Sequence, residues 1–318
     1  MKKVSVIIPN YNGEKYILGC INSLKRQTFR DFDVIFVDNA SEDNSLQMTR
    51  ENAKPLDIQY IVNNANYGFA KAVNMGIKAS KGEYVILLNN DTKVGKHFVE
   101  ELVTAIESDE KIFSAQALIL QYNNRNRIDT AGDFYCAIGY EFSQGKDRPA
   151  GEYSEMGQIF SSCAGAAIYR KKIFERIGYF DEDFFAYLED VDIGYRAKLY
   201  GYDNVIAPKA KVLHIGSATS GSKYNEFKVS LAARNNIFLM YKNFAPWQLA
   251  LNCIPVACGI AVKAAFFAEK GLLGAYAKGI YSGITNYEKI KRVRYKNARY
   301  VSVQKDLYKY TLKRLGGK

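Results

Sequence analysis

The sequence has few of the residues that build disulfide frameworks, zinc sites or dinucleotide sites. Its five cysteines are odd in number and form no CxxC pair, which argues against a disulfide framework and a zinc site. No GxGxxG follows an early strand-like segment, which disfavours a dinucleotide oxidoreductase. No signal peptide is recognised either, because the first three residues lead directly into a strand-like run. We therefore expect a cytosolic protein with free thiols.

The chain does contain enough apolar sequence for a large core, since 48% of its 318 residues are hydrophobic. Most of the net charge of +11 lies in residues 286–318, which hold eleven Lys and Arg residues against two acidic residues. Residues 244–262 are nineteen positions without a charge. An apolar helix followed by a cationic, tyrosine-rich tail favours an anionic membrane surface over nucleic acid. A spanning helix and an interface between copies of the chain are the alternatives.

Short apolar runs alternate with helical patterns over the first hundred residues. The expected strands are 4–8, 33–37, 58–62 and 84–88, and the expected helices are 16–27, 45–52 and 70–78. This alternation predicts a parallel sheet covered by helices on both faces. Polar clusters follow the four strands at 10–12, 38–41, 63–66 and 89–91. Ligands bind beyond the carboxyl ends of such strands, so we expect these clusters to line one site.

The rest of the chain is less regular, with helices expected at 171–177 and 187–200. Residues 161–167 are all small, which permits either the close approach of a substrate or tight packing. The Gly- and Ser-rich stretch 217–222 is interpreted as a lid or a plain loop. We expect a first domain over 1–225, with a nucleotide-binding half (1–110) and an acceptor half (111–225), and a helical extension over 226–318.

Six motifs in a fixed order carry a resemblance to a known family. They are VIIPNYN at 6–12, VDNAS at 37–41, NYGFA at 66–70 with Asn74, LNND at 88–91, EDVD at 189–192, and His214. Over about residues 1–220 the chain resembles the inverting nucleotide-sugar glycosyltransferases of family two, and in particular their bacterial rhamnosyltransferase-like branch. The resemblance implies an α/β fold of the GT-A type: a Rossmann-like mixed, mostly parallel sheet flanked by helices. Here it would carry a C-terminal helical, membrane-associating extension.

The resemblance also implies the catalytic groups. Asp91 would hold Mg²⁺ or Mn²⁺ against the donor diphosphate, and His214 would supply an imidazole to the same metal or to the phosphate. The pattern departs from the family's Asp-x-Asp, because Asn89 stands at the first position and removes one negative charge. Asp190 would be the general base, with Glu189 as a second catalytic carboxylate. The other interpretation of this acidic motif is that it only complements the start of a helix.

Further residues are assigned to the two substrates on the same basis. Those assigned to the nucleotide sugar are Pro9, Asn10, Asn12, Asp38, Asn39, Asn66, Gly68, Lys71, Asn90 and Asp91. Those assigned to the acceptor are Gly165, Ala166 and Asp192, the last of which is also an alternative base. Asp38 resembles the residue that reads the base or ribose. Lys71 either pairs with the diphosphate or is a solvated surface charge.

These expectations describe a metal-dependent inverting hexosyltransferase of bacterial surface polysaccharide and cell-wall synthesis. It would move a sugar from dTDP-rhamnose or a UDP-hexose to a hydroxyl of a lipid-linked or polymeric glycan. It would work at the inner face of the cell membrane as a peripheral protein, without nucleic acid, and homo-oligomers through the C-terminal helices stay open. A nucleotidyltransferase is disfavoured because no Lys or Arg lies between Pro9 and Lys15. A catalytically degenerate glycan-binding or scaffold protein is the alternative, which Asn89 supports.

Overall fold

The structure is a computed structural model that describes residues 2–215 and 224–316, so the predicted lid at 217–222 lies outside the described residues. Its strands are β1 (Val4–Asn10), β2 (Phe32–Asp38), β3 (Ile58–Val62), β4 (Tyr84–Leu88), β5 (Thr92–Val94), β6 (Ile112–Gln121), β7 (Ile128–Thr130), β8 (Asp133–Cys136), β9 (Tyr140–Ser143), β10 (Gly157–Ile159), β11 (Ala166–Arg170) and β12 (Asp203–His214). Its α-helices are α1 (Ile17–Leu24), α2 (Ser45–Glu51), α3 (Gly68–Ala79), α4 (Phe98–Glu107), α5 (Lys171–Ile177), α6 (Glu189–Tyr200), α7 (Glu226–Asn243), α8 (Pro246–Glu269), α9 (Leu273–Asn286) and α10 (Asn297–Leu315).

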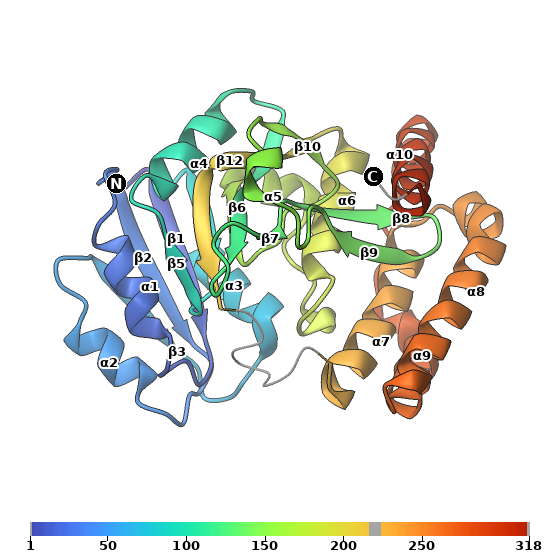
Figure 1. Cartoon of the computed structure of the whole chain (residues 1–318), viewed down its shortest axis with the longest axis horizontal. Helices are drawn as coiled ribbons and strands as arrows, with labels where there is room; N and C mark the ends of the chain where they lie inside the picture. Colours follow the sequence, from blue (N-terminus) through green and yellow to red (C-terminus); the bar gives the residue numbers. More distant parts are fainter. Residues whose placement is uncertain (1, 216–223, 317–318) are drawn as a thin grey trace.

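A ten-stranded mixed sheet forms the centre of the molecule (Figure 1). Its main path runs β10-β12-β6-β11-β4-β1-β2-β3, while β5 pairs with β12 and β7 with β6. Strands β1 to β4 are parallel to one another, β11 is antiparallel to both β4 and β6, and β6 is parallel to β12. The carboxyl ends of β1, β2, β4, β6 and β12 therefore lie at one edge of the sheet.

Each face of this sheet has its own apolar core, because strand side chains point alternately to the two faces. In β4, Ile86 and Leu88 pack with α1 and α4, whereas Val85 and Leu87 pack with α3, α5 and α6. The expected parallel sheet with helices on both faces is thus present.

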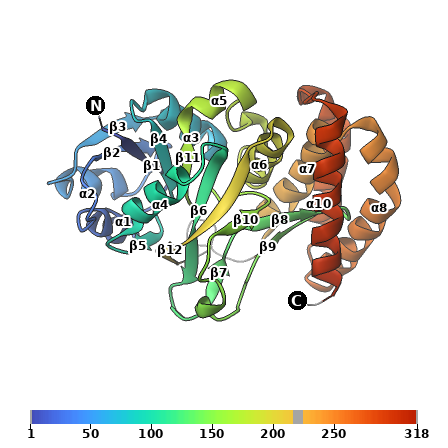
Figure 2. The same ribbon diagram turned by 90° about the horizontal axis from the view of Figure 1, so that it is seen from above.

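The C-terminal helices gather at one end of the molecule, away from β1 to β3 (Figures 1 and 2). A further core joins α7 and α10 to α6 and to the β8–β9 hairpin, with buried Tyr195, Phe238, Leu239 and Leu307 among its members. Helix α6 therefore packs on the sheet with one side and on the C-terminal helices with the other. The division of the chain at 225 into two domains stays a prediction.

Helix α8 buries polar residues and exposes apolar ones. Its buried residues are Gln248, Asn252 and Gly259, while Ile254 and Val262 are 73% and 65% exposed. Gln248 Nε2 and Asn252 Nδ2 each donate to Gln304 Oε1 of α10 at 3.0 Å. Among the described residues α8 is the helix long and apolar enough to cross a membrane, with a mean hydropathy of 1.8 and 11% of that window buried.

Candidate active site

The polar residues that end β1, β2 and β4 form one buried hydrogen-bond network. Asn90 Nδ2 donates to Asn10 Oδ1 at 2.7 Å, and Asn10 Nδ2 donates to Asp38 Oδ1 at 2.9 Å. Ser41 donates to both oxygens of Asp38, from its hydroxyl (2.7 Å) and its backbone N–H (3.0 Å). Because Asn10, Asp38 and Asn90 are almost fully buried, they fix the floor of the site. Pro9, the residue before Asn10 in β1, is partly exposed.

Residues after β2 and after β3 extend the same edge. Asn39 Nδ2 donates to the carbonyl of Gly68 at 3.1 Å, and Asn66 Oδ1 accepts from the Gly68 N–H at 3.0 Å. Gly68 has φ +82°, and a Cβ there would lie 2.5 Å from the ring of Phe185. Only glycine fits this position, because both the dihedral and the close contact exclude a side chain. The sheet edge is thereby joined to the segment that precedes Asp190.

Asp91, His214 and Asp129 form a chain of acidic and imidazole groups. Strand β12 pairs with β5 so that His214 lies opposite Thr92, which brings His214 Nε2 to 3.4 Å from Asp91 Oδ2. His214 Nδ1 lies 2.7 Å from Asp129 Oδ2, and Lys146 pairs with the same carboxylate. Asp91 Oδ1 is buried and has no hydrogen-bond partner among the described residues. A proton on Nδ1 would leave Nε2 as a ligand atom oriented by Asp129.

The charges of His214 and Asp129 depend on each other. Burial by itself would lower the pKa of His214, but the hydrogen bonds with Asp129 and Asp91 outweigh it and raise that pKa to about 9. Burial would raise the pKa of Asp129, yet the bonds from His214 and Lys146 bring it down to about 2. In the absence of a cation the imidazole is therefore held in its charged form.

Asp190 is tied to the Asn89–Asp91 triplet through the segment of small residues. The Ala164 N–H donates to Asp190 Oδ2 at 3.4 Å, and the Val191 N–H donates to Oδ1 at 2.9 Å. One residue further along, the carbonyl of Gly165 accepts from the N–H of Asn89 at 2.9 Å. Adjacent residues of one segment thus contact both the acidic motif and the triplet, which are a hundred positions apart in the chain.

Several groups that lose or gain protons surround Asp190. Asp133, Cys163 and Asp190 each place one potential ligand atom within 4.8 Å of the other two. Burial raises the pKa of Asp190, although the N–H groups of Ala164 and Val191 counteract this. The pKa of Asp133 is raised well above its ordinary value by burial, by Glu141 and by Asp190. A partly desolvated carboxylate with a raised pKa suits proton abstraction at neutral pH.

The turn before Asp190 has an unusual backbone. Phe185, Tyr187 and Leu188 have φ values of 64°, 70° and 67° although none is glycine. Each such residue costs about 1–2 kcal/mol, and such strain concentrates at functional sites. It also explains why α6 begins at Glu189 and not at 187 as predicted, because a right-handed helix cannot include these dihedrals.

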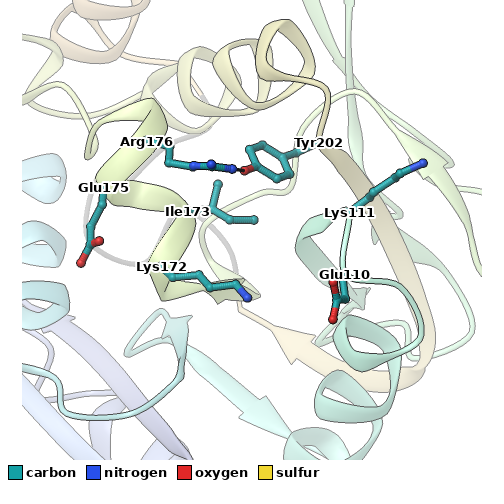
Figure 3. A pocket seen from close by; sticks show the side chains of 7 residues that line it. All are labelled: Glu110, Lys111, Lys172, Ile173, Glu175, Arg176 and Tyr202. Carbon is teal, nitrogen blue, oxygen red and sulfur yellow. Dashed lines mark hydrogen bonds between the residues drawn. The ribbon is translucent and has the colours of Figure 1, made fainter.

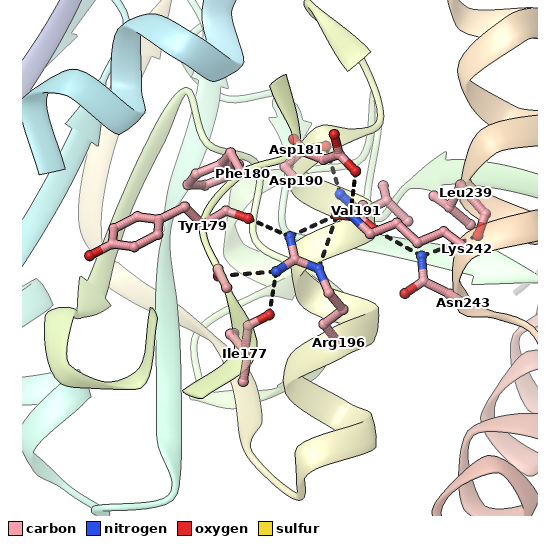
Figure 4. Close-up of polar contacts among 12 residues, drawn as sticks. Ile177, Tyr179, Phe180, Asp181, Asp190, Val191, Arg196, Leu239, Lys242 and Asn243 are labelled. Atoms are coloured by element: carbon pink, nitrogen blue, oxygen red, sulfur yellow. Dashed lines mark hydrogen bonds and ion pairs between the residues drawn. The ribbon is translucent and has the colours of Figure 1, made fainter. Parts of the chain in front are cut away.

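Two residues assigned to the acceptor do not fit that role. Asp192 is fully buried, and its oxygens accept from Arg196, from Lys242 at 2.9 Å and from Asn243 at 2.8 Å. Figure 4 labels these three donors. Burial would raise the pKa of Asp192, but the two cations hold it at about 2. Ala166 is fully buried in the sheet opposite Leu88. Neither side chain has a surface that a substrate could reach, so we withdraw both assignments.

The other predicted residues differ in what they contact. Glu189 is buried, with one carboxylate oxygen unpaired among the described residues, and burial followed by Asp190 raises its pKa well above the ordinary value. Lys71 Nζ lies 4.1 Å from the ring centre of Tyr67, and Asn12 is exposed. Sequence reasoning missed Asp129 and Asp133, which lie in the irregular middle of the chain outside any motif.

A surface hollow lies elsewhere on the molecule (Figure 3). Its lining residues include Lys111, Lys172 and Tyr202, and Arg176 donates to the Tyr202 hydroxyl at 2.8 Å. Lys172 follows the end of β11, where Arg170 pairs with Tyr84 at the start of β4. This hollow therefore lies at the edge of the sheet opposite to Asp91, and it includes none of the predicted site residues.

Solved structures with the same arrangement of strands and helices define the class of fold. One is GalNAc-T7 with UDP, GalNAc and Mn²⁺, with a TM-score of 0.62 and 18% identity over 76% of this chain and 48% of that one. Another is TarS 1-349 of S. aureus in complex with UDP-GlcNAc, with a TM-score of 0.55 and 19% identity over 96% of this chain and 80% of that one. At this identity the likeness concerns the fold, which is of the GT-A type.

The sequence places the chain within a family of this class. The pattern described as Glycosyl transferase family 2 matches residues 5–178, and the chain belongs to this family. One relative is the glycosyltransferase GlyG of Streptococcus pneumoniae serotype 4, which is 31% identical over 145 residues, or 44% of this chain and 45% of the relative. The chain covers less than half the length of this and the next curated relatives. The expected family and fold are confirmed, whereas the rhamnosyltransferase-like branch is not singled out.

Proposed function

We propose that this protein is a metal-dependent inverting glycosyltransferase. It transfers a sugar from a nucleotide diphosphate sugar to a hydroxyl of a lipid-linked or polymeric glycan in bacterial surface polysaccharide synthesis. The observation that carries the proposal is the segment 163–165, which contacts Asn89 on one side and Asp190 on the other. It keeps a candidate metal-binding carboxylate and a candidate base at the same edge of the sheet.

The residues around Asp91 fit a divalent cation. The buried Asp91 Oδ1, unpaired among the described residues, and the neighbouring His214 Nε2 would supply an oxygen and a nitrogen donor, a set that suits Mn²⁺ better than Mg²⁺. Asp129 behind His214 supplies the carboxylate that commonly orients a metal-bound imidazole. When bound, the cation would neutralise charge on the leaving diphosphate. The Mn²⁺ in the GalNAc-T7 structure supports this assignment.

Asp190 provides the proton acceptor. Its two oxygens are aimed by the N–H groups of Ala164 and Val191, which leaves lone pairs for the hydroxyl of an acceptor. As that hydroxyl attacks the anomeric carbon from the face opposite to the diphosphate, its proton passes to Asp190 and the configuration inverts. Glu189 is the alternative base, although its burial leaves it less accessible.

The donor side rests on the network of Asn10, Asp38 and Asn90, with Pro9, Asn12, Asn39, Asn66 and Gly68 around it and Lys71 as the candidate diphosphate partner. A UDP-hexose is favoured over dTDP-rhamnose, since the two solved structures named above hold UDP or UDP-GlcNAc. The test is a panel of nucleotide sugars with Mn²⁺, with Mg²⁺ and with a chelator, read as nucleotide release and thermal stabilisation. Stabilisation by no nucleotide would favour the scaffold protein instead.

The exposed side of α8 suits the surface of an anionic membrane, where a lipid-linked acceptor would be found. Leu251, Ile254 and Val262 point outward, and eleven Lys and Arg residues lie in 286–318. Apolar insertion and attraction to acidic headgroups reinforce each other in such surfaces. We infer that the protein works in the cytoplasm on the inner face of the membrane, attached through α8 without spanning it.

Replacing Leu251, Ile254 and Val262 together by Gln should reduce binding to phosphatidylglycerol-containing vesicles by more than tenfold, since burying one such side chain contributes about 1.5–3 kcal/mol. Cosedimentation with vesicles of 30% and of 0% anionic lipid measures this. Gln at the exposed Val62 and Met156 is the control, which should bind as the wild type does. Equal vesicle binding by the triple variant, or a concentration-dependent dimer that disappears in it, would reject the membrane role.

Asp133→Asn should stabilise the protein at neutral pH. The raised pKa of Asp133 means that the folded state keeps a proton that the unfolded chain loses above the ordinary Asp pKa. Stability is therefore lost as the pH rises through the interval between these two values, and Asn abolishes that loss. Urea unfolding at pH 7 and at pH 4.5 measures the difference, which should shrink at the lower pH. Because Asn is isosteric with the neutral acid, sugar transfer should persist.

A further inference from the structure

Helix α7 holds the strained turn that leads into Asp190. The side-chain NH₂ group of Asn235 lies within hydrogen-bond distance of three carbonyl oxygens of this turn, those of Phe184 (2.9 Å), Ala186 (2.8 Å) and Tyr187 (2.8 Å), which share its two hydrogens. Asn235 is fully buried, so these bonds do not compete with water. One side chain thus fixes the direction of three peptide units.

Neighbouring residues of α7 contact the same stretch of chain. Arg234 donates to the Asn235 Oδ1 atom at 2.9 and 3.0 Å, which orients the amide, and to the carbonyls of Asp183 and Phe184. Phe238 packs against Phe184, with their ring centres 6.2 Å apart. Further along the helix Lys242 pairs with Asp181 and Asp192, and Asn243 with Asp192 (Figure 4).

The turn needs this support because of its backbone. Phe185, Tyr187 and Leu188 have positive φ values, which non-glycine residues keep only where the surrounding structure enforces them. Leu188 is the residue immediately before α6, so a change in its dihedrals alters where the helix starts. Asp190 lies in the first turn of that helix, and its carboxylate would then lose its alignment with the Ala164 N–H.

We propose that Asn235 is a positioning residue for sugar transfer: by holding the carbonyls of 184–187 it sets the direction of the Asp190 carboxylate. This rests on the proposed function, because direction matters only if Asp190 accepts the acceptor's proton. The inference gives part of the C-terminal helical region a role in catalysis apart from membrane attachment. It concerns a helix that begins 48 residues beyond the part of the chain that matches the family pattern.

The test compares Asn235→Asp with Asn236→Asp in the full-length protein. Asn235→Asp keeps the size of the side chain but replaces the donating NH₂ group by an oxygen that faces three carbonyls. Asn236 is the matched control, because it is the next residue on the helix, is also buried and uses its Oδ1 to accept from Tyr135, which Asp can still do. Hydrogen exchange of peptides covering 183–192 is measured beside kcat and the donor KM.

We expect faster exchange at 183–192 in Asn235→Asp with unchanged exchange in β1 to β4. The kcat should fall by about 10²-fold, as expected for a catalytic group displaced by about 1 Å, while the donor KM stays near the wild-type value. Unchanged exchange at 183–192 overturns the inference whatever the activity, and so does faster exchange with a wild-type kcat. Equal losses in Asn236→Asp would reduce the effect to general destabilisation. If the wild type is inactive with every donor, and exchange at 183–192 is still faster in Asn235→Asp than in the wild type, the proposed function is rejected. The support of the turn by Asn235 then remains.

Discussion

Asp190→Asn is expected to lower kcat for sugar transfer by about 10³-fold, because a positioned general base contributes about 10²–10⁴-fold. Asn retains the shape of the side chain, and its single oxygen can keep the shorter of the two hydrogen bonds, the one from the Val191 N–H, so the fold and donor binding should be preserved. The loss should therefore appear in kcat and not in the donor KM. Steady-state kinetics with the preferred donor, together with a thermal unfolding curve, measure both.

Two neighbouring carboxylates serve as controls for this prediction. Asp133 has a potential ligand atom within 4.8 Å of one on Asp190, but burial, Glu141 and Asp190 raise its pKa well above the ordinary value, which disfavours the ionised form that a base needs. Asp133→Asn should therefore leave turnover of the wild-type order. Glu189→Gln tests the other residue of the acidic pair, whose buried carboxyl has a raised pKa as well. If turnover survives in Asp190→Asn but is lost in Glu189→Gln, the base is Glu189.

Asp91→Asn should lower kcat/KM by about 10²- to 10³-fold, because each factor of ten corresponds to about 1.4 kcal/mol and a metal contributes several kcal/mol to the stabilisation of developing charge. The substitution removes the negative charge that the buried Oδ1 offers to a cation. Titration of Mn²⁺ into the protein with saturating nucleotide should show weaker metal binding, independently of turnover.

Asp129→Asn provides a graded comparison, since Asp129 contacts His214 and is not one of the residues proposed to hold the cation. Loss of a carboxylate that orients a metal-bound imidazole typically costs about 10–100-fold. An effect of Asp91→Asn no larger than that of Asp129→Asn, with unaltered Mn²⁺ binding, would place the metal elsewhere. The donors Asp133, Cys163 and Asp190 would then have to be considered.

The regular elements were predictable because their signal is local. The apolar runs at 33–37, 58–62 and 84–88 correspond closely to β2, β3 and β4, and the helix at 171–177 has the predicted bounds. Buried parallel strands are continuous apolar segments, which the sequence displays directly. The polar residues after β1, β2 and β4 meet at one edge, as their position at the ends of parallel strands implied.

The contacts of the site were not predictable in the same way, because they join residues far apart in the chain. Asp192 belongs to the same acidic motif as Asp190, and the one nearby partner that distinguishes them is Arg196, four positions after Asp192. The rest of their difference arises from Lys242 and Asn243, about fifty positions later, which also contact the buried Asp192. The proposed role of Asp129 likewise depends on a distant residue, because β12 brings His214 beside it. Such roles depend on tertiary partners and have no local signature.

The amides inside α8 have a consequence for the handling of this protein. Turning the helix by half a revolution about its own axis would separate Gln248 and Asn252 from Gln304 and leave the buried amide of Gln304 without these partners, at a cost of about 1–3 kcal/mol. This cost opposes a rotation of α8 that would bury its exposed apolar residues Leu251, Ile254 and Val262 when no lipid is present. Purification without detergent should yield a folded protein that tends to aggregate. Substitution of these three residues by Gln should improve its solubility without destabilising the packing of the C-terminal helices.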